Sequence, residues 1–298
     1  LGFFNNRINV SLAWYKNRSS QQLIGYQLTV TTGFTSILAN LNAEVENRGW
    51  EIELQARPVS SKNFRWETGF NITFPVNRLI SFPGLEQSTY ANTFVLGHST
   101  SVVHLYHLEG IDPATGLYRF TDVNGDGKIS APDDTKTLSD LSPQYFGGWH
   151  NNLKFKQWDL SFLWQFIGQQ NRNYHSIMPV PGSMNNQPEE VLNVWTPENP
   201  SGVYMPYTSG SNGSKNALHG YFQNSDASVS DASFIRLKNL SLGYSFVPKD
   251  AWIREVKLYL QGQNLLTFSR YFGVDPEFTQ QGYLPPLRTY SLGFQLQF

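Results

Sequence analysis

One stretch of the sequence has the residue types and spacing of a calcium-binding loop. In DVNGDGKISAPD, at residues 122–133, side chains that carry oxygen atoms recur at alternate positions. Calcium takes about six to eight oxygen ligands, and a loop that folds round the ion could bring several of these groups to one centre. The ligands that we predict are Asp122, Asn124, Asp126, the carbonyl of Lys128, Ser130 through a water molecule, and Asp133.

The same loop departs from an EF-hand in two respects. Asp133 stands where an EF-hand has a bidentate Glu, and Pro132, with no helical pattern beside it, argues against a helix-loop-helix unit. Asn-Gly and Asp-Gly pairs also favour tight turns without any metal. A metal-free turn is therefore the alternative, and a bound calcium ion would serve to stiffen the loop.

Other groups that could do chemistry are less convincing. His104 and His107 are three positions apart on an extended segment, so they point to opposite faces and do not suit one metal ion. Glu51 and Glu53 share a strand face, but they are more simply a polar patch than a glycosidase pair. Because there is also no nucleophile elbow and no phosphate loop, we predict that the protein is not an enzyme.

Composition narrows the class of protein. With 22 basic and 23 acidic residues the net charge is −1, which gives no reason to expect a nucleic-acid partner. Charged residues make up 15% and aromatic residues another 15%, whereas an ordinary soluble domain has about 25% charged residues. There is no cysteine, which excludes disulfides and thiol chemistry, and no apolar run long enough for a membrane helix. The chain begins with neither Met nor a signal peptide, and we expect a fragment.

The elements that must position these groups are long strands with one apolar and one polar face. In WEIELQAR, at 50–57, Trp50 and Ile52 alternate with Glu51 and Glu53. Helical periodicity of useful length is absent. The pattern predicts about eight strands, most of about ten to fourteen residues, at 5–16, 45–57, 63–74, 144–156, 158–168, 233–246, 255–267 and 287–298.

Short and long connections alternate between these predicted strands. Structureless loops longer than about 15 residues are uncommon in a compact soluble domain, whereas short turns on one side and long loops on the other are typical of an outer-membrane barrel. The short connections are 58–63, 156–158 and 247–254, and the long ones are 17–44, 75–143, 169–232 and 268–286.

A membrane barrel explains the strands better than a soluble sandwich does. Both need two-faced strands, but only the barrel needs about nine to eleven residues per strand to cross the hydrocarbon. Aromatic residues near strand ends, such as Trp14 and Trp50, match the girdles of such barrels, and charges on the polar face suit a wet lumen. We therefore predict an all-β, antiparallel transmembrane barrel with short periplasmic turns and long extracellular loops.

The chain also resembles the C-terminal part of SusC/RagA-type TonB-dependent outer-membrane transporters. The resemblance spans nearly the whole chain and implies that residues 1–298 form the last third of a barrel of about 22 strands, whose N-terminal plug is not in this chain. It rests on an ordered set of stretches: ENRGWEIEL at 46–54, DVNGDGKIS at 122–130, SPQYFGGWHNNLKFKQWDLSF at 142–162, VWTPENP at 194–200, ASFIRLKNLSLGYSF at 232–246, LQGQNLLTFSRYFGVDPEF at 260–278, and the closing RTYSLGFQLQF.

This resemblance implies import of oligosaccharides or peptides across the outer membrane of a Gram-negative cell. TonB would drive the transport through the plug, and a SusD-like surface lipoprotein would cap the barrel on its long loops. The alternatives are a soluble all-β carbohydrate-binding module with a structural calcium ion, and a passive porin without a plug. Aromatic residues at the rim and in the loops could stack on sugar rings: Trp149, Tyr174, Trp195, Tyr204 and Tyr207.

The last strand carries the final prediction. Its apolar side chains fall on one face, which would meet outer-membrane lipid, and the strand would close the barrel against the first one. The resemblance implies that this strand, with its terminal aromatic residue, is the signal that the barrel-assembly machinery recognises. The residues of this signal are Tyr290, Leu292, Phe294, Leu296 and Phe298.

Overall fold

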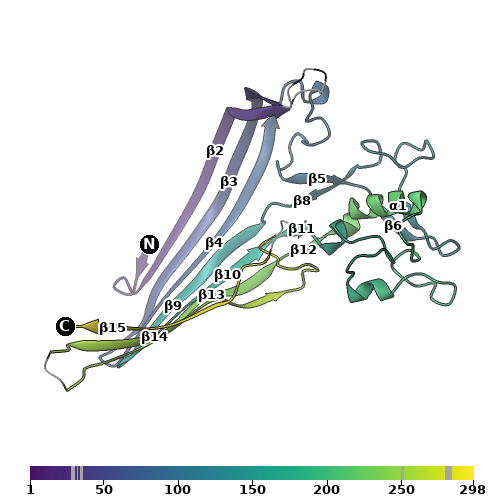
Figure 1. Cartoon of the computed structure of the whole chain (residues 1–298). Helices are drawn as coiled ribbons and strands as arrows, with labels where there is room; N and C mark the ends of the chain where they lie inside the picture. The colour runs from purple at the N-terminus through teal and green to yellow at the C-terminus, as the bar shows by residue number, and fades with distance from the viewer. Residues whose placement is uncertain (28–30, 32, 34–35, 250–251, 279–283) are drawn as a thin grey trace.

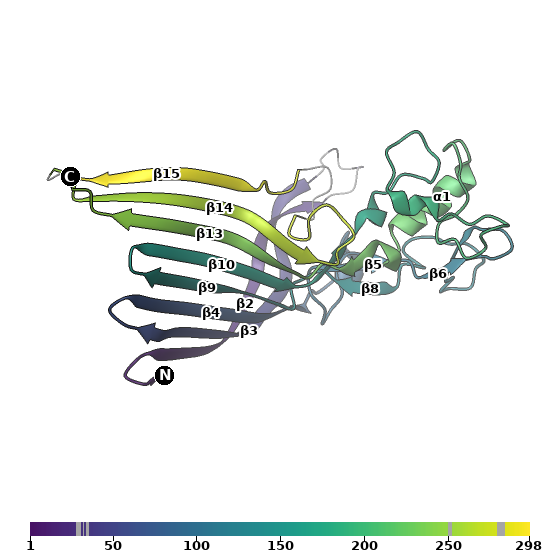
Figure 2. The same ribbon diagram turned by 90° about the horizontal axis from the view of Figure 1, so that it is seen from below.

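The computed structural model describes residues 1–27, 31, 33, 36–249, 252–278 and 284–298. Its main feature is one curved antiparallel sheet of nine strands, in which each strand pairs with its neighbours in chain order (Figures 1 and 2). The sheet does not close on itself, so β1 and β15 form its two edges. The strands are β1 (Gly2–Phe3), β2 (Ile8–Gln27), β3 (Ser36–Ser60), β4 (Phe64–Ser81), β9 (Tyr145–Phe155), β10 (Trp158–Gly168), β13 (Phe234–Phe246), β14 (Glu255–Ser269) and β15 (Thr289–Gln297).

The eight predicted long strands are all present, but one predicted loop is wrong. Residues 17–44 are largely strand, because β2 runs to Gln27 and β3 begins at Ser36, while 28–30, 32 and 34–35 lie outside the described residues. The ladder continues from Arg18, opposite Glu46, to Gln27, opposite Ser36. Residues 16–22 are polar on both faces, which hid this extension, since a strand with water on both sides need not alternate.

The short connections lie together at one end of the sheet (Figure 2). Residues 61–63 join β3 to β4, and Lys156 and Gln157 join β9 to β10. Lys156 has a φ of 53°, a left-handed conformation that a two-residue hairpin requires. The other three predicted long connections, which follow β4, β10 and β14, leave from the opposite end (Figure 2).

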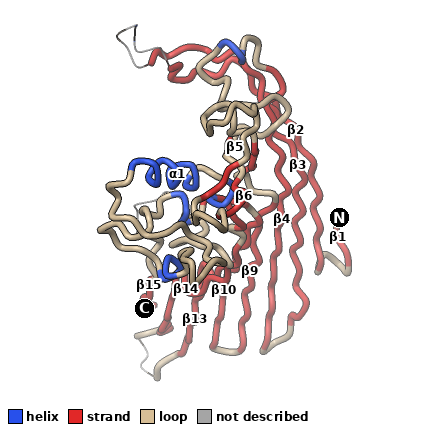
Figure 3. Tube along the Cα trace, turned by 90° about the vertical axis from the view of Figure 1, so that its right-hand side faces the viewer, coloured by secondary structure: helices blue, strands red, loops and turns tan. Residues whose placement is uncertain are grey.

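Two of the long connections, residues 82–143 and 169–232, fold together into what we call the loop cap (Figures 1 and 3). The loop cap contains the helix α1 (Gly213–Gln223), capped by Asn212, whose side chain accepts a hydrogen bond from the Lys215 backbone N–H. The sequence showed no helical periodicity of useful length, and this one short helix did not reveal itself. The helix has 11 residues and two glycines, too little for its period to show. The other elements are β5 (Val102–Leu105) with β8 (Thr137–Asp140), β6 (Leu108–Ile111) with β7 (Tyr118–Phe120), β11 (Gln170–Arg172) with β12 (Val229–Asp231), and the 3₁₀ turns η2 (Leu85–Gln87), η3 (Tyr174–Ser176), η4 (Glu189–Leu192) and η5 (Asp226–Ser228).

The larger hydrophobic core lies in the loop cap and not against the sheet. Tyr118 and Phe222 stack there with ring centroids 4.5 Å apart. A smaller cluster of Ala43, Leu79, Phe82 and Leu85 lies where β3 and β4 meet the loops. The core residues of the loop cap are Tyr106, Tyr118, Phe120, Met178, Val191, Val194, Tyr204, Met205 and Phe222.

The apolar face of the sheet is left uncovered. Leu160, Leu242, Leu260 and Leu292 form one row across four strands, and Leu292 is 82% exposed. The neighbouring row on the opposite face is Ser161, Ser241, Gln261 and Ser291. This alternation leaves apolar side chains on one face of the strands and polar ones on the other, as the sequence predicted. Within the described ranges, no helix is long and apolar enough to cross a membrane.

Candidate functional site

The polar face of the sheet is concave and holds a recess of about 470 Å³. Strands β3, β4 and β9 line it with Glu53, Arg57, Glu67 and His150. Arg57 Nε lies 3.2 Å from Glu67 Oε1 in an ion pair, and both side chains are exposed. Because an exposed pair of this kind is weakly held in water, these groups remain available to a solute in the recess.

A second recess of about 540 Å³ lies nearer the short turns. Lys257 Nζ lies 2.8 Å from Asp159 Oδ1 across this surface. Arg65 stands directly opposite Lys154, and the structure gives neither of these two described residues an ion pair. The concave face thus carries charges of both signs along its length, a surface that suits a water-filled lumen.

The predicted aromatic set is divided between two places. Trp149 lies on β9 with its ring on the outward face, edge-on to Phe162. Its indole N–H donates a hydrogen bond to Thr68 Oγ1 at 3.0 Å. Since a solute in the lumen or on the loops cannot reach that face, we remove Trp149 from the substrate-binding set. The other four residues all lie in the loop cap.

Most of those four residues pack inside the loop cap. Tyr204 is buried, its hydroxyl lies 2.9 Å from His175 Nε2, and burial raises the pKa of Tyr204. Tyr174 packs edge-on against Phe272, and Trp195 covers Gly116. Gly116 has a φ of 71°, and a Cβ atom there would meet the indole ring.

Tyr207 alone of the four presents a large exposed surface. Its side chain is 49% exposed, while its hydroxyl donates a hydrogen bond to the Val191 carbonyl at 3.2 Å. A ring held in this way by its hydroxyl can offer a face to a ligand. Among the predicted aromatic residues, Tyr207 is thus the one whose position fits a stacking role.

The carboxylates of the predicted calcium loop bind backbone amides. Asp122 accepts hydrogen bonds from the N–H groups of Gly125 and Gly127, both at 2.7 Å. Asp126 accepts one from Lys128 at 2.8 Å, and Asn124 accepts one from Asp126 at 3.1 Å. These are the Asx turns that Asn-Gly and Asp-Gly sequences favour.

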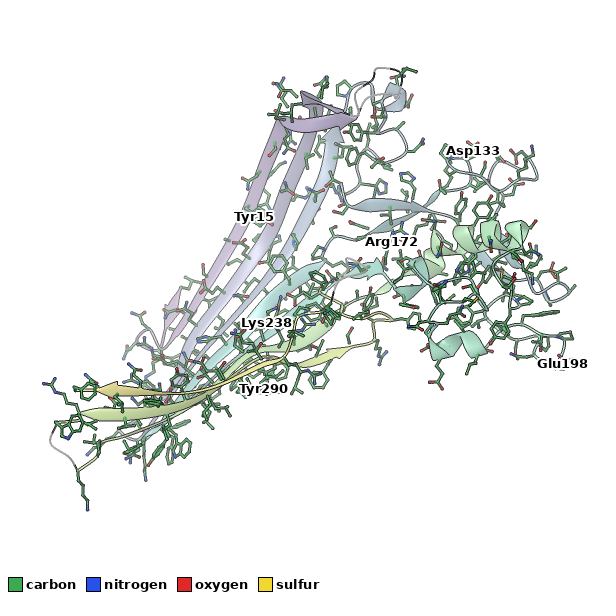
Figure 4. The ribbon with its side chains drawn as sticks, viewed as in Figure 1. Tyr15, Asp133, Arg172, Glu198, Lys238 and Tyr290 are labelled. Atoms are coloured by element: carbon green, nitrogen blue, oxygen red, sulfur yellow. The ribbon has the colours of Figure 1, made fainter. Side chains whose placement is uncertain are left out.

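Asp134, which we did not predict, is the buried carboxylate of this loop. It accepts hydrogen bonds from Val123 and Ser130 at 2.8 Å each, and these backbone donors hold its pKa below the usual value. Asp133 is exposed instead (Figure 4). The motif counts positions only, so the sequence could not show which of the adjacent residues Asp133 and Asp134 turns inward. In the described part of the chain, no group of three or more His, Cys, Asp or Glu side chains lies close enough to hold a metal ion. Calcium stays a prediction.

Sequence reasoning also missed a buried charge cluster where β13 enters the loops. Arg236, 1% exposed, donates to Asp275 and Glu277 at 2.6 Å each and to Thr267 at 2.9 Å. Lys238, labelled in Figure 4, adds a bond to Glu277 at 2.9 Å. Removing one partner of such a buried pair is strongly destabilising, so this cluster fixes residues 275–277 on the sheet. An Arg among apolar strand residues was the available signal.

An antiparallel sheet with an uncovered apolar face, a polar concave face, and short turns at one end defines the class of outer-membrane β-barrel proteins. Comparison with curated proteins gives the same answer. TonB-dependent receptor P3 of Formosa agariphila is 27% identical over 100% of this chain, and receptor P26 of that organism is 30% identical over 99%. TonB-dependent receptor SusC of Bacteroides thetaiotaomicron is 25% identical over 100%. The chain covers 33%, 33% and 31% of these relatives.

Solved structures agree with the sequence relatives. The structure of the RagAB peptide transporter matches with a TM-score of 0.81 and 25% identity, over 100% of this chain and 34% of that one. The RagAB peptide importer in its 'open-open' state matches with a TM-score of 0.77 at 23% identity, which supports the fold. No family model matches the chain.

Over its whole length the chain is similar to a part of SusC/RagA-type TonB-dependent receptors, and it resides in the outer membrane as part of a β-barrel. The prediction of an antiparallel membrane barrel is confirmed, with nine strands in the sheet where about eight were expected. The chain spans about a third of the length of the curated relatives that it matches. The activity of the whole protein is therefore argued separately below.

Proposed function

We propose that this chain forms part of the barrel of an outer-membrane importer for peptides or oligosaccharides. The observation that carries the proposal is the match of the whole two-faced sheet to a peptide transporter, with a TM-score of 0.81. The polar concave face supports it, because a solute must cross the membrane along hydrophilic groups. TonB would supply the energy through a plug formed by another part of the full-length protein.

A SusD-like surface lipoprotein is the proposed partner on the loop cap. Several large apolar side chains of the loop cap are exposed, and such patches mark interaction surfaces. They are Met184, Leu192, Val203 and Tyr207, which are 100%, 74%, 54% and 49% exposed. All four lie in the connection between β10 and β13, which leaves from the extracellular end of the sheet.

The surface properties bear on the two classes of cargo. Carboxylates and basic groups lie side by side on the concave face, as in the pair Arg57 and Glu67, which suits charged peptides. The exposed ring of Tyr207 suits a sugar. The proposal therefore includes both peptides and oligosaccharides as cargo. It also includes a structural calcium ion in the loop at 122–133.

Uptake by cells that carry the full-length protein tests the proposal. Labelled peptides and oligosaccharides should enter cells with an active TonB and should not enter cells that lack TonB. Entry that is independent of TonB would indicate a passive porin instead. If the purified chain stays monomeric in buffer without detergent, it behaves as a soluble carbohydrate-binding module, and the transport proposal fails.

A further inference from the structure

We propose that the outward face of β2, β3 and β4 binds the phosphate groups of an anionic lipid of the outer leaflet. The site is a group of basic side chains that we call the outer cation cluster: Lys16, Arg18, Arg48 and Arg78. The proposal is independent of the cargo and of TonB, since it concerns the lipid-facing side of the barrel.

The register of the three strands places this cluster just above the apolar band. Leu12, Ile52 and Ile72 form one outward row, and Trp14, Trp50 and Phe74 form the next. Two residues further along each strand lies the row Lys16, Arg48 and Val76, followed by the row Arg18, Glu46 and Arg78. No bulge interrupts this part of either ladder, so all four rows share one face.

The aromatic row marks the boundary of the hydrocarbon. Trp14 is 53% exposed and Trp50 is 49% exposed, as expected for side chains in an interfacial girdle. The cations lie on the side of the long loops, which in an outer-membrane barrel is extracellular. The first groups that they would meet there are the headgroups of the outer leaflet.

The charges in the cluster do not balance. Glu46, whose side chain is 5% exposed, is shared by three cations: Lys16 Nζ at 3.1 Å, Arg18 Nε at 2.8 Å and Arg48 Nη1 at 3.7 Å. Arg18 also contacts Glu44 at 3.0 Å. The structure gives Arg78, a described and exposed residue, no ion pair. Two carboxylates therefore face four cations, in a chain whose net charge is −1.

This arrangement suits a lipid phosphate better than an internal salt bridge. The buried Glu46 holds the cations in place, yet the side chains of Lys16, Arg18 and Arg48 remain 38%, 50% and 40% exposed. Guanidinium groups bind phosphate oxygens in pairs, which adds both geometry and strength. Because the cluster adjoins the aromatic row, a phosphate held there would carry its acyl chains into the apolar band below.

Binding of a bis-phosphorylated lipid A to the full-length protein in detergent tests the proposal. The double variant Lys16→Gln/Arg78→Gln should bind on the order of 25-fold more weakly, at roughly five-fold for each cation removed near an anionic surface. The matched control is Lys154→Gln/Arg65→Gln, which removes one Lys and one Arg from the concave face. This control should bind like the parent protein.

Four results would overturn the proposal. The first is that the control variant loses as much affinity as the cluster variant. The second is that dephosphorylated lipid A binds as tightly as the phosphorylated form. The third is that millimolar inorganic phosphate displaces the lipid fully, which would indicate a site for free phosphate. Glu44→Gln removes a competing carboxylate without removing a cation, and it should tighten lipid binding by roughly five-fold. The change in gel mobility on heating shows whether the barrel of that variant is folded. If it is folded and its affinity for the lipid is unchanged, this result would also contradict the proposal.

Discussion

At the residue scale, two histidines, the buried His219 and the half-buried His175, link the loop cap to pH. His175 lies 3.0 Å from the Ala227 carbonyl through Nδ1 and 2.9 Å from the Tyr204 hydroxyl through Nε2. His219 lies 2.7 Å from the Met178 carbonyl through Nε2, and its Nδ1 is buried without a partner. Burial lowers the pKa of both imidazoles. Each is therefore neutral in the folded loop cap near neutral pH.

We expect the loop cap to lose stability as the pH falls below the ordinary histidine pKa of about 6.5. A histidine whose pKa is lower in the folded than in the unfolded state stabilises the fold fully at pH values above the unfolded pKa. As the pH falls below that value, the unfolded chain binds a proton that the folded chain does not, and the contribution is lost. Hydrogen exchange in residues 213–223, corrected for the intrinsic rate at each pH, measures the effect. His219→Gln should reduce the pH dependence, whereas His98→Gln, exposed and outside this core, should leave it unchanged. A pH-independent exchange rate would contradict this account.

A second residue-scale prediction concerns a polar side chain on the lipid-facing surface. Asn151 is 1% exposed there, and its Oδ1 accepts a hydrogen bond from the Trp66 indole N–H at 2.9 Å. A buried acceptor left without a donor costs about 1–3 kcal/mol. Trp66→Phe should therefore lower the free energy of unfolding in detergent by about that amount. Trp158→Phe, at a position where the structure gives no indole hydrogen bond, should cost less. Equal losses in the two variants would show that ring volume, not the hydrogen bond, is decisive.

At the element scale, β15 presents its apolar side chains outward. Tyr290, Leu292 and Phe294 are 68%, 82% and 69% exposed, and Phe298 stacks on Trp252 at 5.7 Å. We expect deletion of Phe298 from the full-length protein to reduce the folded fraction in the outer membrane several-fold. Gln297→Ala, one residue earlier and on the opposite face, is the control. Heat-modified gel mobility of isolated membranes measures both variants, and normal insertion of the deletion would remove the assembly role.

The loop at 122–133 gives the second prediction for an element. If calcium binds, Asp122 and Asp126 must exchange backbone N–H partners for the ion, because their oxygens now accept hydrogen bonds. Calorimetry should then show binding with a Kd of roughly 10⁻⁴ to 10⁻³ M, which Asp126→Ala abolishes. Asp112→Ala removes an Asx turn outside the motif and should leave binding intact. Identical titrations of the parent protein and Asp126→Ala would support the metal-free turn.

The membrane-spanning elements were predictable, while those in water were less so. Lipid on one side and water on the other impose alternation at every position, and this signal located β9, β10, β13 and β14 almost to the residue. Beyond Trp14 the segment 16–22 is polar on both faces, so the alternation is lost there and the strands continued unseen. The roles of Asp134 and Arg236 depend on hydrogen bonds that form only after the loops fold.

At the scale of the whole molecule, the orientation of the sheet decides between the membrane barrel and any soluble alternative. In the row Leu160, Leu242, Leu260 and Leu292, the apolar side chains would face lipid, whereas the adjacent row that includes Ser241 would face water. A soluble protein with the same sheet would leave Leu242, 38% exposed, on a wet surface. Substitutions at these two adjacent positions therefore separate the two environments.

We expect Leu242→Lys to destabilise the barrel by about 1–4 kcal/mol, the cost rising with its depth, because a Lys on the lipid face must leave water or distort the bilayer. Ser241→Lys, the matched control on the concave face, should cost under about 1 kcal/mol, because its ammonium group stays hydrated beside Ser161 and Gln261. Denaturant unfolding of the full-length protein in lipid vesicles measures both values. If the two variants are equally stable, Leu242 does not face lipid. The outward face, the aromatic girdle and the outer cation cluster would then all be misplaced, since they rest on the same register.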